Sequence, residues 1–335
     1  MKPKLLIVEL WGLGDLAIAT PFLRAASERF DVTLLAKPYA LDLQRRLWPG
    51  VRAVAFVAPW TAFKNKYRLW HWPWREMIRL RKQMTHEHFD LGISARRITS
   101  PPLSGDVRDH LLLRVFGVKN RIGFPFLHHR FFLTQPVVHP EPDAHRYESW
   151  RAIARALDFE LPAREKILIP AAPSRETILI HTGAGQPVRV WPLEKYKKLA
   201  ARLRQKKIQV QIACDPDQRL WWLRAGETGV ATPATVAELI VLTDRAGAFI
   251  GNDSGPGHLA AFCGVPTFTL FGDQLPEWFA PLHPASEWIE GKVCPYLPCS
   301  DYCRFPTPYC LWNVSEDEVW QRVEKFTATH LPGRP

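Results

Sequence analysis

The sequence predicts an α/β protein with two domains, each built around a parallel β-sheet. Three observations support this prediction. Short apolar segments alternate with segments of helical periodicity, and the alternation occurs in both halves of the chain. The chain has 335 residues, of which 47% are hydrophobic, and this is enough for two full cores. A loop-like segment at 160–177 separates the two halves.

Each half contains strands that alternate with helices. In the first half we expect a strand at Leu5–Val8, a helix at Leu16–Phe30 and a strand at Val32–Leu35. In the second half we expect a basic amphipathic helix at Leu193–Lys206 and three strands, at Ile178–His181, Ile208–Ala213 and Ala246–Gly251. We therefore predict two Rossmann-like domains, which comprise residues 1–171 and 172–335.

The charge of the chain indicates an anionic partner. The 44 Lys and Arg residues exceed the 33 Asp and Glu residues, which gives a net charge of +11. Such a charge suits nucleic acid, a membrane surface or a phosphorylated substrate, and does not choose among them. The N-terminal apolar segment resembles a secretory signal, but Glu9 and Asp15 interrupt it. No apolar run reaches the ~18 residues of a membrane span, so we expect a cytoplasmic protein, with contact at a membrane surface left open.

The loop after the first strand carries a candidate catalytic acid. Trp11–Asp15 contains two glycines that form G-x-G-x-x-A with Ala17, which is part of a dinucleotide-binding pattern. That pattern requires an acid after the second strand, where this chain has Lys37. What remains is Asp15 on a glycine turn at a helix start. It is either an N-cap or a general base facing a cleft.

The loop after the Ile178–His181 strand is suited to an anion. Its sequence, HTGAGQPVRVWP, contains small residues that allow backbone N–H groups to approach a phosphate, and Arg189 adds a guanidinium group. The alternative is a glycine-rich turn with an exposed arginine.

A third loop, GNDSGPGH at 251–258, joins a strand to a helix that starts at Ser254 or Gly255 and ends at Gly264. The start of such a helix directs N–H groups and a positive dipole end at a ligand, which suits a diphosphate. His258 lies one turn into the helix. Asp253 would repel phosphate unless it orients the loop or neighbouring donors.

These motifs resemble those of a known family. The segment GNDSGPGHLAAFCGVPTFTLFGDQLPEWFAP resembles the donor-site signature of glycosyltransferase family 9, the lipopolysaccharide heptosyltransferases. Gly14-Asp15 with Thr20-Pro21 is similar to the N-terminal motif of that family, HTGAG…RVWP to its middle motif, and HRYESWRAIARAL to a helix before its interdomain linker. The matches run in order from residue 5 to about residue 320.

The resemblance implies a GT-B fold, in which two Rossmann-like domains face each other across a cleft. The N-terminal domain would bind the acceptor and the C-terminal domain the nucleotide-sugar, with inverting transfer and without a metal or cofactor. Asp15 would be the general base. The donor-binding residues implied by the motifs are Thr182, Arg189, Asp217, Asp253, Ser254, Gly255 and His258, with Gln218 in place of Asp217 if the register shifts by one.

The resemblance also implies ADP-heptose as the donor and an anionic lipopolysaccharide core or related glycan as the acceptor. A UDP-N-acetylglucosamine donor is the alternative. Two other classes explain less of the sequence. An NADP-dependent oxidoreductase accounts only for the first loop, and a non-catalytic binder of anionic surfaces accounts only for the charge. Nucleic acid is therefore not the expected partner.

Two further segments carry their own expectations. The first has the spacing C-x4-C-x3-C-x6-C, at Cys294, Cys299, Cys303 and Cys310. It is expected to be a local structural element, reduced or disulfide-linked, with a metal site as the alternative.

The second, Trp60–Lys82, holds four tryptophans and seven basic residues against one acid. It suits the surface of the inner membrane; the alternative is a basic surface helix after a packed aromatic loop. Further basic residues would extend this surface: Arg96, Arg97, Arg121, His128, His129 and Arg130.

Overall fold

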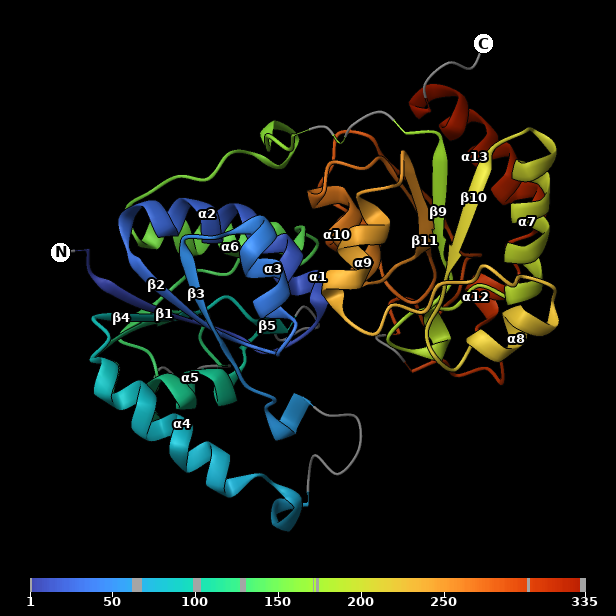
Figure 1. The fold of residues 1–335 in the computed structure, drawn as a ribbon. Coiled ribbons are helices and arrows are strands. Elements are labelled where there is room, and N and C mark those ends of the chain that lie inside the picture. Colours follow the sequence, from blue (N-terminus) through green and yellow to red (C-terminus); the bar gives the residue numbers. More distant parts are fainter. Residues whose placement is uncertain are drawn as a thin grey trace. The chain divides into compact units, whose positions relative to one another are not determined.

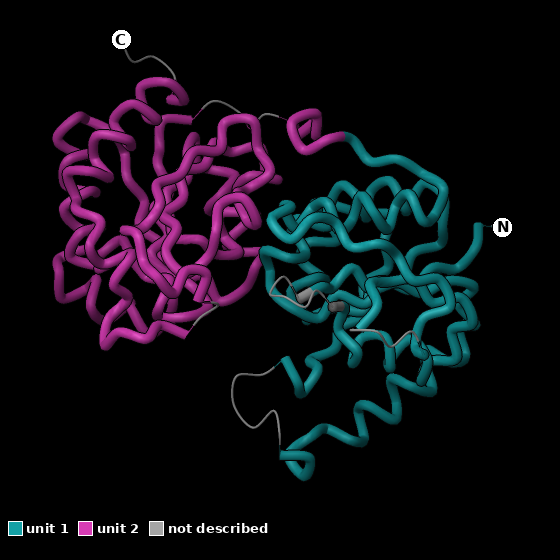
Figure 2. Tube along the Cα trace, turned by 180° about the vertical axis from the view of Figure 1, so that it is seen from behind, with its two compact units in different colours: residues 1–162 teal, residues 163–335 magenta. Residues whose placement is uncertain are grey.

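The chain forms two compact units, residues 1–162 and 163–335, coloured separately in Figure 2. The computed structural model describes residues 2–61, 68–98, 104–126, 131–170, 172, 175–299 and 302–331. The expected domain boundary after residue 171 and the division after residue 162 both lie in the segment that joins the last helix of the first unit to the first strand of the second.

The first unit contains a parallel six-stranded sheet with the strand order β3-β2-β1-β4-β7-β8. Its strands are β1 (Lys4–Glu9), β2 (Asp31–Ala36), β3 (Val51–Ala55), β4 (Leu91–Ser94), β7 (Asn120–Gly123) and β8 (Gln135–Pro136). A short antiparallel pair is formed by β5 (Arg97–Ile98) and β6 (Ser104–Gly105). The helices are α1 (Leu13–Ile18), α2 (Thr20–Arg29), α3 (Ala40–Leu47), α4 (Trp74–Glu87), α5 (Val107–Val115) and α6 (Arg146–Ala156), with single 3-10 turns at Pro59–Thr61 and Leu69–His71.

Helices cover both faces of this sheet. Helices α2, α3 and α6 lie on one face, and α4 and α5 lie on the other (Figure 1). Leu6 and Val8 of β1 pack against Met84 of α4 and Leu113 of α5 in one buried cluster. Because β1 is buried on both faces, it consists of an almost continuous apolar run.

The second unit contains a parallel five-stranded sheet with the order β10-β9-β11-β12-β13. Its strands are β9 (Thr177–His181), β10 (Gln209–Ala213), β11 (Ala248–Asn252), β12 (Thr267–Phe271) and β13 (Ser286–Glu290). The helices are α7 (Leu193–Gln205), α8 (Arg219–Arg224), α9 (Val236–Thr243), α10 (Gly255–Phe262), α11 (Pro276–Phe279), α12 (Tyr309–Trp312) and α13 (Glu316–His330), with 3-10 turns at Arg164–Lys166 and Pro187–Arg189.

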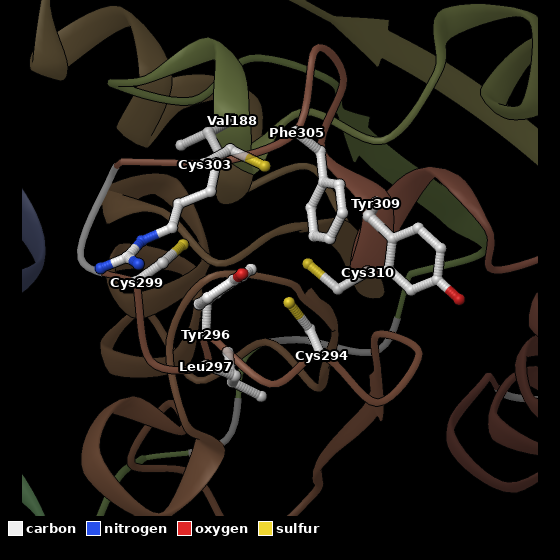
Figure 3. A pocket seen from close by; sticks show the side chains of 10 residues that line it. Val188, Cys294, Tyr296, Leu297, Cys299, Cys303, Phe305, Tyr309 and Cys310 are labelled. Carbon is white, nitrogen blue, oxygen red and sulfur yellow. The ribbon is translucent and has the colours of Figure 1, made fainter.

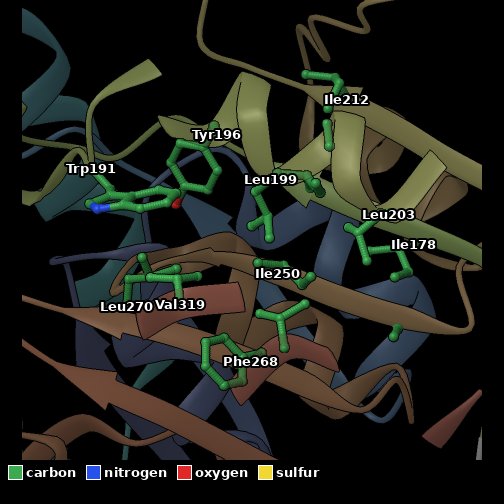
Figure 4. Packing of buried hydrophobic residues seen from close by; sticks show 14 of the residues in the cluster. Ile178, Trp191, Tyr196, Leu199, Leu203, Ile212, Ile250, Phe268, Leu270 and Val319 are labelled. Atoms are coloured by element: carbon green, nitrogen blue, oxygen red, sulfur yellow. The ribbon is translucent and has the colours of Figure 1, made fainter. Parts of the chain in front are cut away.

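In this unit α7 and α13 lie on one face of the sheet, and α9 and α10 lie on the other (Figure 1). Leu199 and Leu203 of α7 pack with Ile250 of β11, Phe268 of β12 and Val319 of α13 (Figure 4). The alternation of strands and helices predicted from the sequence therefore produces two separate α/β cores.

The predicted helix at Leu16–Phe30 is wrong in its start and in its continuity. The structure has two helices, α1 from Leu13 and α2 from Thr20, which meet at Ala19. Pro21 lies in the first turn of α2. Proline has no N–H to donate and its ring conflicts with a preceding helical turn, so it marks a helix start here.

Candidate functional site

Except for Asp217, which follows the edge strand β10, the predicted functional residues follow strands at the points where the strand order of each sheet changes direction. In the first unit this point lies between β1 and β4, and in the second between β9 and β11. Loops that leave neighbouring parallel strands in opposite directions open a crevice at the carboxyl edge of a sheet, where ligands bind. Asp15 belongs to the first unit and the predicted donor-binding residues belong to the second, so each cluster is described by itself.

Asp15 lies between two arginines. Its Oδ1 is 3.3 Å from Nη1 of Arg96 and 3.8 Å from Nε of Arg146, and its side chain is 18% exposed. Its Oδ2 accepts a hydrogen bond of 3.0 Å from the backbone N–H of Gly12. Asp15 is thus the third residue of α1 and not its N-cap, which is Gly12. The carboxylate reaches back to the helix start while its other oxygen faces cations.

The indole of Trp11 supports the same arginines. The guanidinium carbon of Arg96 lies 4.2 Å from the ring centroid, and that of Arg108 lies 5.3 Å from it. Arg108 is also paired with Asp106 at 2.7 Å, and Tyr39 donates a hydrogen bond of 2.7 Å from its hydroxyl to the backbone carbonyl of Trp11. Cation–π contact and this hydrogen bond hold the loop after β1 in place.

Glu9 is a second carboxyl group close to Asp15. It is 3% exposed and accepts a hydrogen bond of 3.3 Å from the backbone N–H of Trp11. Burial and then the negative charge of Asp15 raise the pKa of Glu9 to about 7, against the opposing effect of Arg96 and Arg146. A carboxyl group with such a pKa changes its charge near neutral pH.

Burial also lowers the pKa values of two cations in this cluster, Arg146 and Lys37. Burial, followed by the positive charge of Arg96, lowers the pKa of Arg146 to about 9. Burial lowers the pKa of Lys37 as well, although the charges of Asp15 and Glu9 oppose the effect. The first unit therefore has a mixed cluster of two carboxyl groups and several cations at the end of β1.

Sequence reasoning recovered this cluster in part. It found Asp15, but it treated Glu9 only as an interruption of an apolar run and did not consider Tyr39 or Arg146. Arg146 is the first residue of α6, in the quoted motif HRYESW, and the fold brings it to Asp15. Arg96 was expected only as part of a basic surface; it follows β4, whose pairing with β1 brings it to Asp15.

The expectation that Arg97 extends a basic surface is wrong. Arg97 is 2% exposed, and its guanidinium group donates to the carbonyls of Pro140, Glu141 and Ala144. A buried guanidinium group needs such acceptors, and here they tie the segment before α6 to β5. Arg121 donates in the same way to the carbonyls of Val118 and Phe132, whereas His128, His129 and Arg130 lie outside the described residues.

Thr182, at the end of β9, is part of a buried hydrogen-bond network. Its hydroxyl donates to Oε1 of Gln218 at 2.8 Å and accepts from Nε1 of Trp222 at 3.1 Å. Its carbonyl accepts from Nδ2 of Asn252 at 2.9 Å. Thr182 is fully buried, so these bonds fix the loop after β9 to α8 and β11. Gln218, the alternative ribose-binding residue, is likewise held by Thr182.

Arg189 joins two buried acids. Its Nη1 is 3.6 Å from Oδ2 of Asp253, and its Nε is 3.3 Å from Oδ2 of Asp273. The two acids follow β11 and β12, and their side chains are 4% and 0% exposed. Asp273 was not anticipated from the sequence. The geometry fits the expectation that Asp253 orients a neighbouring donor, since it holds a cation beside the start of α10.

Helix α10 starts as the sequence predicts. Ser254 is its N-cap, Gly255 is its first residue, and Gly264 follows with a φ of +84°. The Ser254 hydroxyl does not cap the helix but donates to the carbonyl of Asn252 at 3.2 Å. His258 is 4% exposed in the second turn. The α10 N-terminus thus presents backbone N–H groups and the positive end of the helix dipole without a side-chain cap from Ser254.

A groove of the same unit is formed mainly by the loops after β9 and β10. It has a volume of about 480 Å³ and is lined by Ala184, Gly185, Pro187, Val190, Pro192, Leu193, Glu194, Asp215, Asp217, Gln218, Trp221 and Trp312. Asp217 was predicted, and Asp215 was missed. A Cβ atom at Gly183 would lie 2.2 Å from Cγ of Asp215, so glycine is required for the two loops to approach.

The four clustered cysteines line a separate small pocket (Figure 3). All six cysteines of the chain are free thiols. Burial raises the pKa of the Cys310 thiol to about 11. Within the part of the chain that the structure describes, no group of three or more His, Cys, Asp or Glu side chains is arranged to hold a metal ion.

The Trp-rich segment is only partly described, because residues 62–67 lie outside the described ranges. Trp70 is 78% exposed, and α4 begins at Trp74. None of the helices in the described ranges has the length and apolar character that a bilayer crossing requires.

A comparison with known protein families finds one family model that matches this chain. The family model for glycosyltransferase family 9 (heptosyltransferase) matches residues 77–303, which is more than half of the chain. The matched range includes Arg96, Arg146 and every predicted donor-binding residue, and it begins after Asp15.

Two curated relatives are heptosyltransferases. The chain is 34% identical over 139 residues to lipopolysaccharide heptosyltransferase 3 of Escherichia coli K12, over 39% of this chain and 38% of the relative. It is 30% identical over 169 residues to lipopolysaccharide heptosyltransferase 1 of Pseudomonas aeruginosa, over 46% of this chain and 47% of the relative. The aligned segments therefore span less than half the length of each relative.

Solved structures share the fold over almost the whole chain. The E. coli heptosyltransferase WaaC with ADP superposes with a TM-score of 0.73 at 17% identity, over 96% of this chain and 99% of that one. The same enzyme with ADP-2-deoxy-2-fluoro heptose gives a TM-score of 0.67 at 17% identity, over the same shares. The two parallel sheets with their helices correspond to the GT-B fold, as the sequence predicts.

Proposed function

Because the chain belongs to glycosyltransferase family 9, we propose that it transfers a heptose from ADP-heptose to an anionic lipopolysaccharide core or related glycan. The observation that carries this proposal is the family match over residues 77–303. It is supported by the heptosyltransferase relatives and by the fold shared with an enzyme solved with ADP.

In this proposal Asp15 is the general base. An inverting transfer requires a group that accepts the proton of the acceptor hydroxyl while its oxygen attacks the anomeric carbon. The two guanidinium groups near Asp15 stabilise the ionised carboxylate, which is the form that accepts a proton. Arg96 and Arg146 act as positioning residues for Asp15, and the cations around it suit a phosphorylated acceptor.

The second unit would stabilise the leaving nucleotide. The diphosphate carries negative charge that grows as the glycosidic bond breaks, and the α10 N-terminus, from Ser254 to His258, presents backbone N–H groups to it. Arg189 supplies a positive charge whose position Asp253 and Asp273 fix. These groups would supply the charge stabilisation without a metal ion.

The nucleoside would occupy the groove beside Asp215 and Asp217. Carboxylates accept hydrogen bonds from ribose hydroxyls, and Trp221 and Trp312 supply apolar walls. Thr182 contributes indirectly, since its hydroxyl bonds to Gln218 and Trp222 and so holds the loop that borders the groove.

We further propose that the protein works at the cytoplasmic face of the inner membrane. Exposed Trp70 and the basic residues of α4 support this location, because tryptophan favours the membrane interface and cations favour anionic lipid.

The donor assignment can be tested by thermal stabilisation and by turnover. We expect ADP and ADP-heptose to raise the melting temperature of the purified protein more than UDP, GDP or UDP-N-acetylglucosamine at equal concentration. ADP should be released only when an acceptor is present. Stabilisation by UDP compounds together with indifference to ADP compounds would overturn the heptose assignment.

A further inference from the structure

An apolar groove of the first unit has no role in the proposed chemistry. It has a volume of about 360 Å³, within the roughly 300–1,000 Å³ range of ligand pockets. It lies between α4 and α5, and its lining is almost entirely aromatic and aliphatic: Phe56, Trp60, Trp72, Trp74, Met77, Ile78, Leu80, Arg81, Arg108, Leu111, Leu112, Val115 and Phe116.

The groove exists because the two helices carry more apolar side chains than the sheet core covers. Leu80 of α4 and Leu112 of α5 are each 8% exposed and pack in the core. Ile78, on α4, is 56% exposed, and Leu111 and Val115, on α5, are 45% and 40% exposed. Exposed apolar side chains that line one concave surface are typical of a binding site.

The charges at the groove favour an anionic amphiphile as its occupant. Arg81 and Arg108 belong to the lining, where Arg108 is paired with Asp106. Helix α4 carries further exposed cations: Arg75, Arg79 and Lys82. Within residues 74–82 the one acid is Glu76. An apolar cavity beside cations matches a hydrocarbon chain attached to an anionic head group. A second copy of this chain fits less well, because its net charge of +11 would oppose these cations.

Arg108 links the groove to the Asp15 cluster of the same unit. Arg108 lines the groove, and its guanidinium carbon is 5.3 Å from the ring centroid of Trp11. Arg96 lies 4.2 Å from that centroid, and its Nη1 is 3.3 Å from Asp15. A head group bound at the Arg108 side of the groove would therefore lie next to the loop that carries Asp15.

We infer that the groove binds an acyl chain of a lipid-linked anionic acceptor, whose glycan extends toward Asp15. This inference rests on the proposed glycosyl transfer. In it, the groove holds the acyl chain of the acceptor, while the glycan of the same molecule reacts at Asp15. The apolar walls supply affinity for the chain, and the cations orient the head group.

Direct binding can be measured with a brominated acyl lysophosphatidic acid below its critical micelle concentration. Bromine quenches tryptophan fluorescence at short range, and Trp60, Trp72 and Trp74 line the groove. We expect saturable quenching, and a weakening of about fourfold for each methylene removed from the chain while it still fills the groove. Quenching that never saturates would overturn the inference.

Variants at exposed positions of the groove distinguish a loss of probe binding from a loss of folding. Val115→Asp and Ile78→Asp place a carboxylate against the chain from opposite walls, and Val241→Asp, on α9 of the other unit, is the matched control at 50% exposure. Both groove variants should lose quenching by the probe, and the control should keep it. Equal quenching in all three, with unchanged melting temperatures, would contradict the assignment.

Turnover then distinguishes this inference from the proposed function. With a lipid-linked acceptor, the groove variants should lose about tenfold or more in kcat/KM, the contribution of roughly two methylenes. With the deacylated glycan they should match the parent. Loss on neither acceptor would overturn the inference while the transferase assignment stands. A parent without turnover on either acceptor would overturn the proposed function, and the quenching experiment would still decide the groove.

The same experiments also identify two other occupants of the groove, a membrane surface and a second copy of this chain. If the variants lose sedimentation with anionic vesicles but keep quenching by the monomeric probe, the groove is a membrane-docking surface and the inference is wrong. If sedimentation velocity shows a dimer of the parent that Val115→Asp dissociates, the occupant is a second copy of this chain.

Discussion

At the scale of single residues, the Asp15 cluster illustrates how neighbours decide the chemistry of a side chain. The sequence left Asp15 open between an N-cap and a base, since both roles suit an aspartate after a glycine turn. Its Oδ2 accepts from Gly12 and its Oδ1 faces Arg96 and Arg146. The N-cap interpretation is therefore wrong, because Gly12 is the N-cap and Asp15 is the third residue of α1. Asp15 supports the helix start through Oδ2, and this contact leaves Oδ1 for the proposed role as a base.

Asp15→Asn separates these two functions. The amide oxygen still accepts the hydrogen bond from Gly12, but it no longer accepts a proton. We expect ADP-heptose binding to remain and kcat to fall by roughly 10²–10⁴-fold. Single-turnover kinetics would measure the loss, with the exposed Asp143→Asn as control. Near-parental kcat in a folded variant would remove Asp15 from the mechanism.

Glu9→Gln tests the buried carboxyl group. Because the pKa of Glu9 is raised to about 7, folding favours its protonated form. Its contribution to stability is present below the unfolded pKa of about 4.5 and is lost as pH rises through about 7. The glutamine variant does not titrate. Its free energy of unfolding should therefore rise relative to the parent between pH 5 and pH 8, by at most about 3 kcal/mol.

Denaturant unfolding across that pH range would measure the effect, with the exposed Glu28→Gln as control. If the difference between the Glu9 variant and the parent stays constant with pH, the carboxyl group does not titrate in this range.

At the scale of elements, the sequence predicted those helix ends that are set by residues within one turn of the end. The sequence predicted α10 from Ser254 or Gly255 to the glycine at 264, because cap residues act within one turn. It missed the break between α1 and α2, although Pro21 was visible, because the apolar periodicity continues through it. The contacts of Asp15 with Arg96 and Arg146 depend on tertiary structure, and so do those of Arg189 with Asp273. No spacing in the sequence predicts them.

The start of α10 gives a test of donor binding. We expect Ser254→Ala and His258→Ala each to weaken ADP binding, because both residues belong to the helix start that would receive the diphosphate. The Ser254 hydroxyl does not cap the helix, so its removal should change stability by less than the ~1 kcal/mol typical of a lost cap.

Calorimetric titration with ADP and with adenosine would locate the effect. The variants should lose affinity for ADP and keep affinity for adenosine, because adenosine has no phosphate. Unchanged ADP affinity in both variants would assign Ser254 and His258 to the fold alone.

At the scale of the whole molecule, the two strand orders explain why functional residues far apart in sequence gather at loops. Each sheet is parallel, so every strand delivers its following loop to one edge, and the change of winding opens a crevice there. The two α/β domains were predicted from alternating periodicity, chain length and the loop-like segment between the halves, and the GT-B fold from the resemblance to the family. The roles proposed for the two units rest on the motifs, because the same alternation of strands and helices occurs in both units.

The net charge of +11 is a property of the whole molecule, and it favours contact with an anionic membrane. A variant of Trp70 tests this contact without changing the groove. Trp70 is 78% exposed and is not part of the groove lining. If the first unit rests on a membrane, Trp70→Ala should reduce sedimentation with anionic vesicles and leave kcat on a water-soluble acceptor unchanged. Raising the salt concentration should weaken binding of both proteins, because the cations of α4 are screened. Sedimentation equal to that of the parent at every salt concentration would argue against a membrane contact through Trp70.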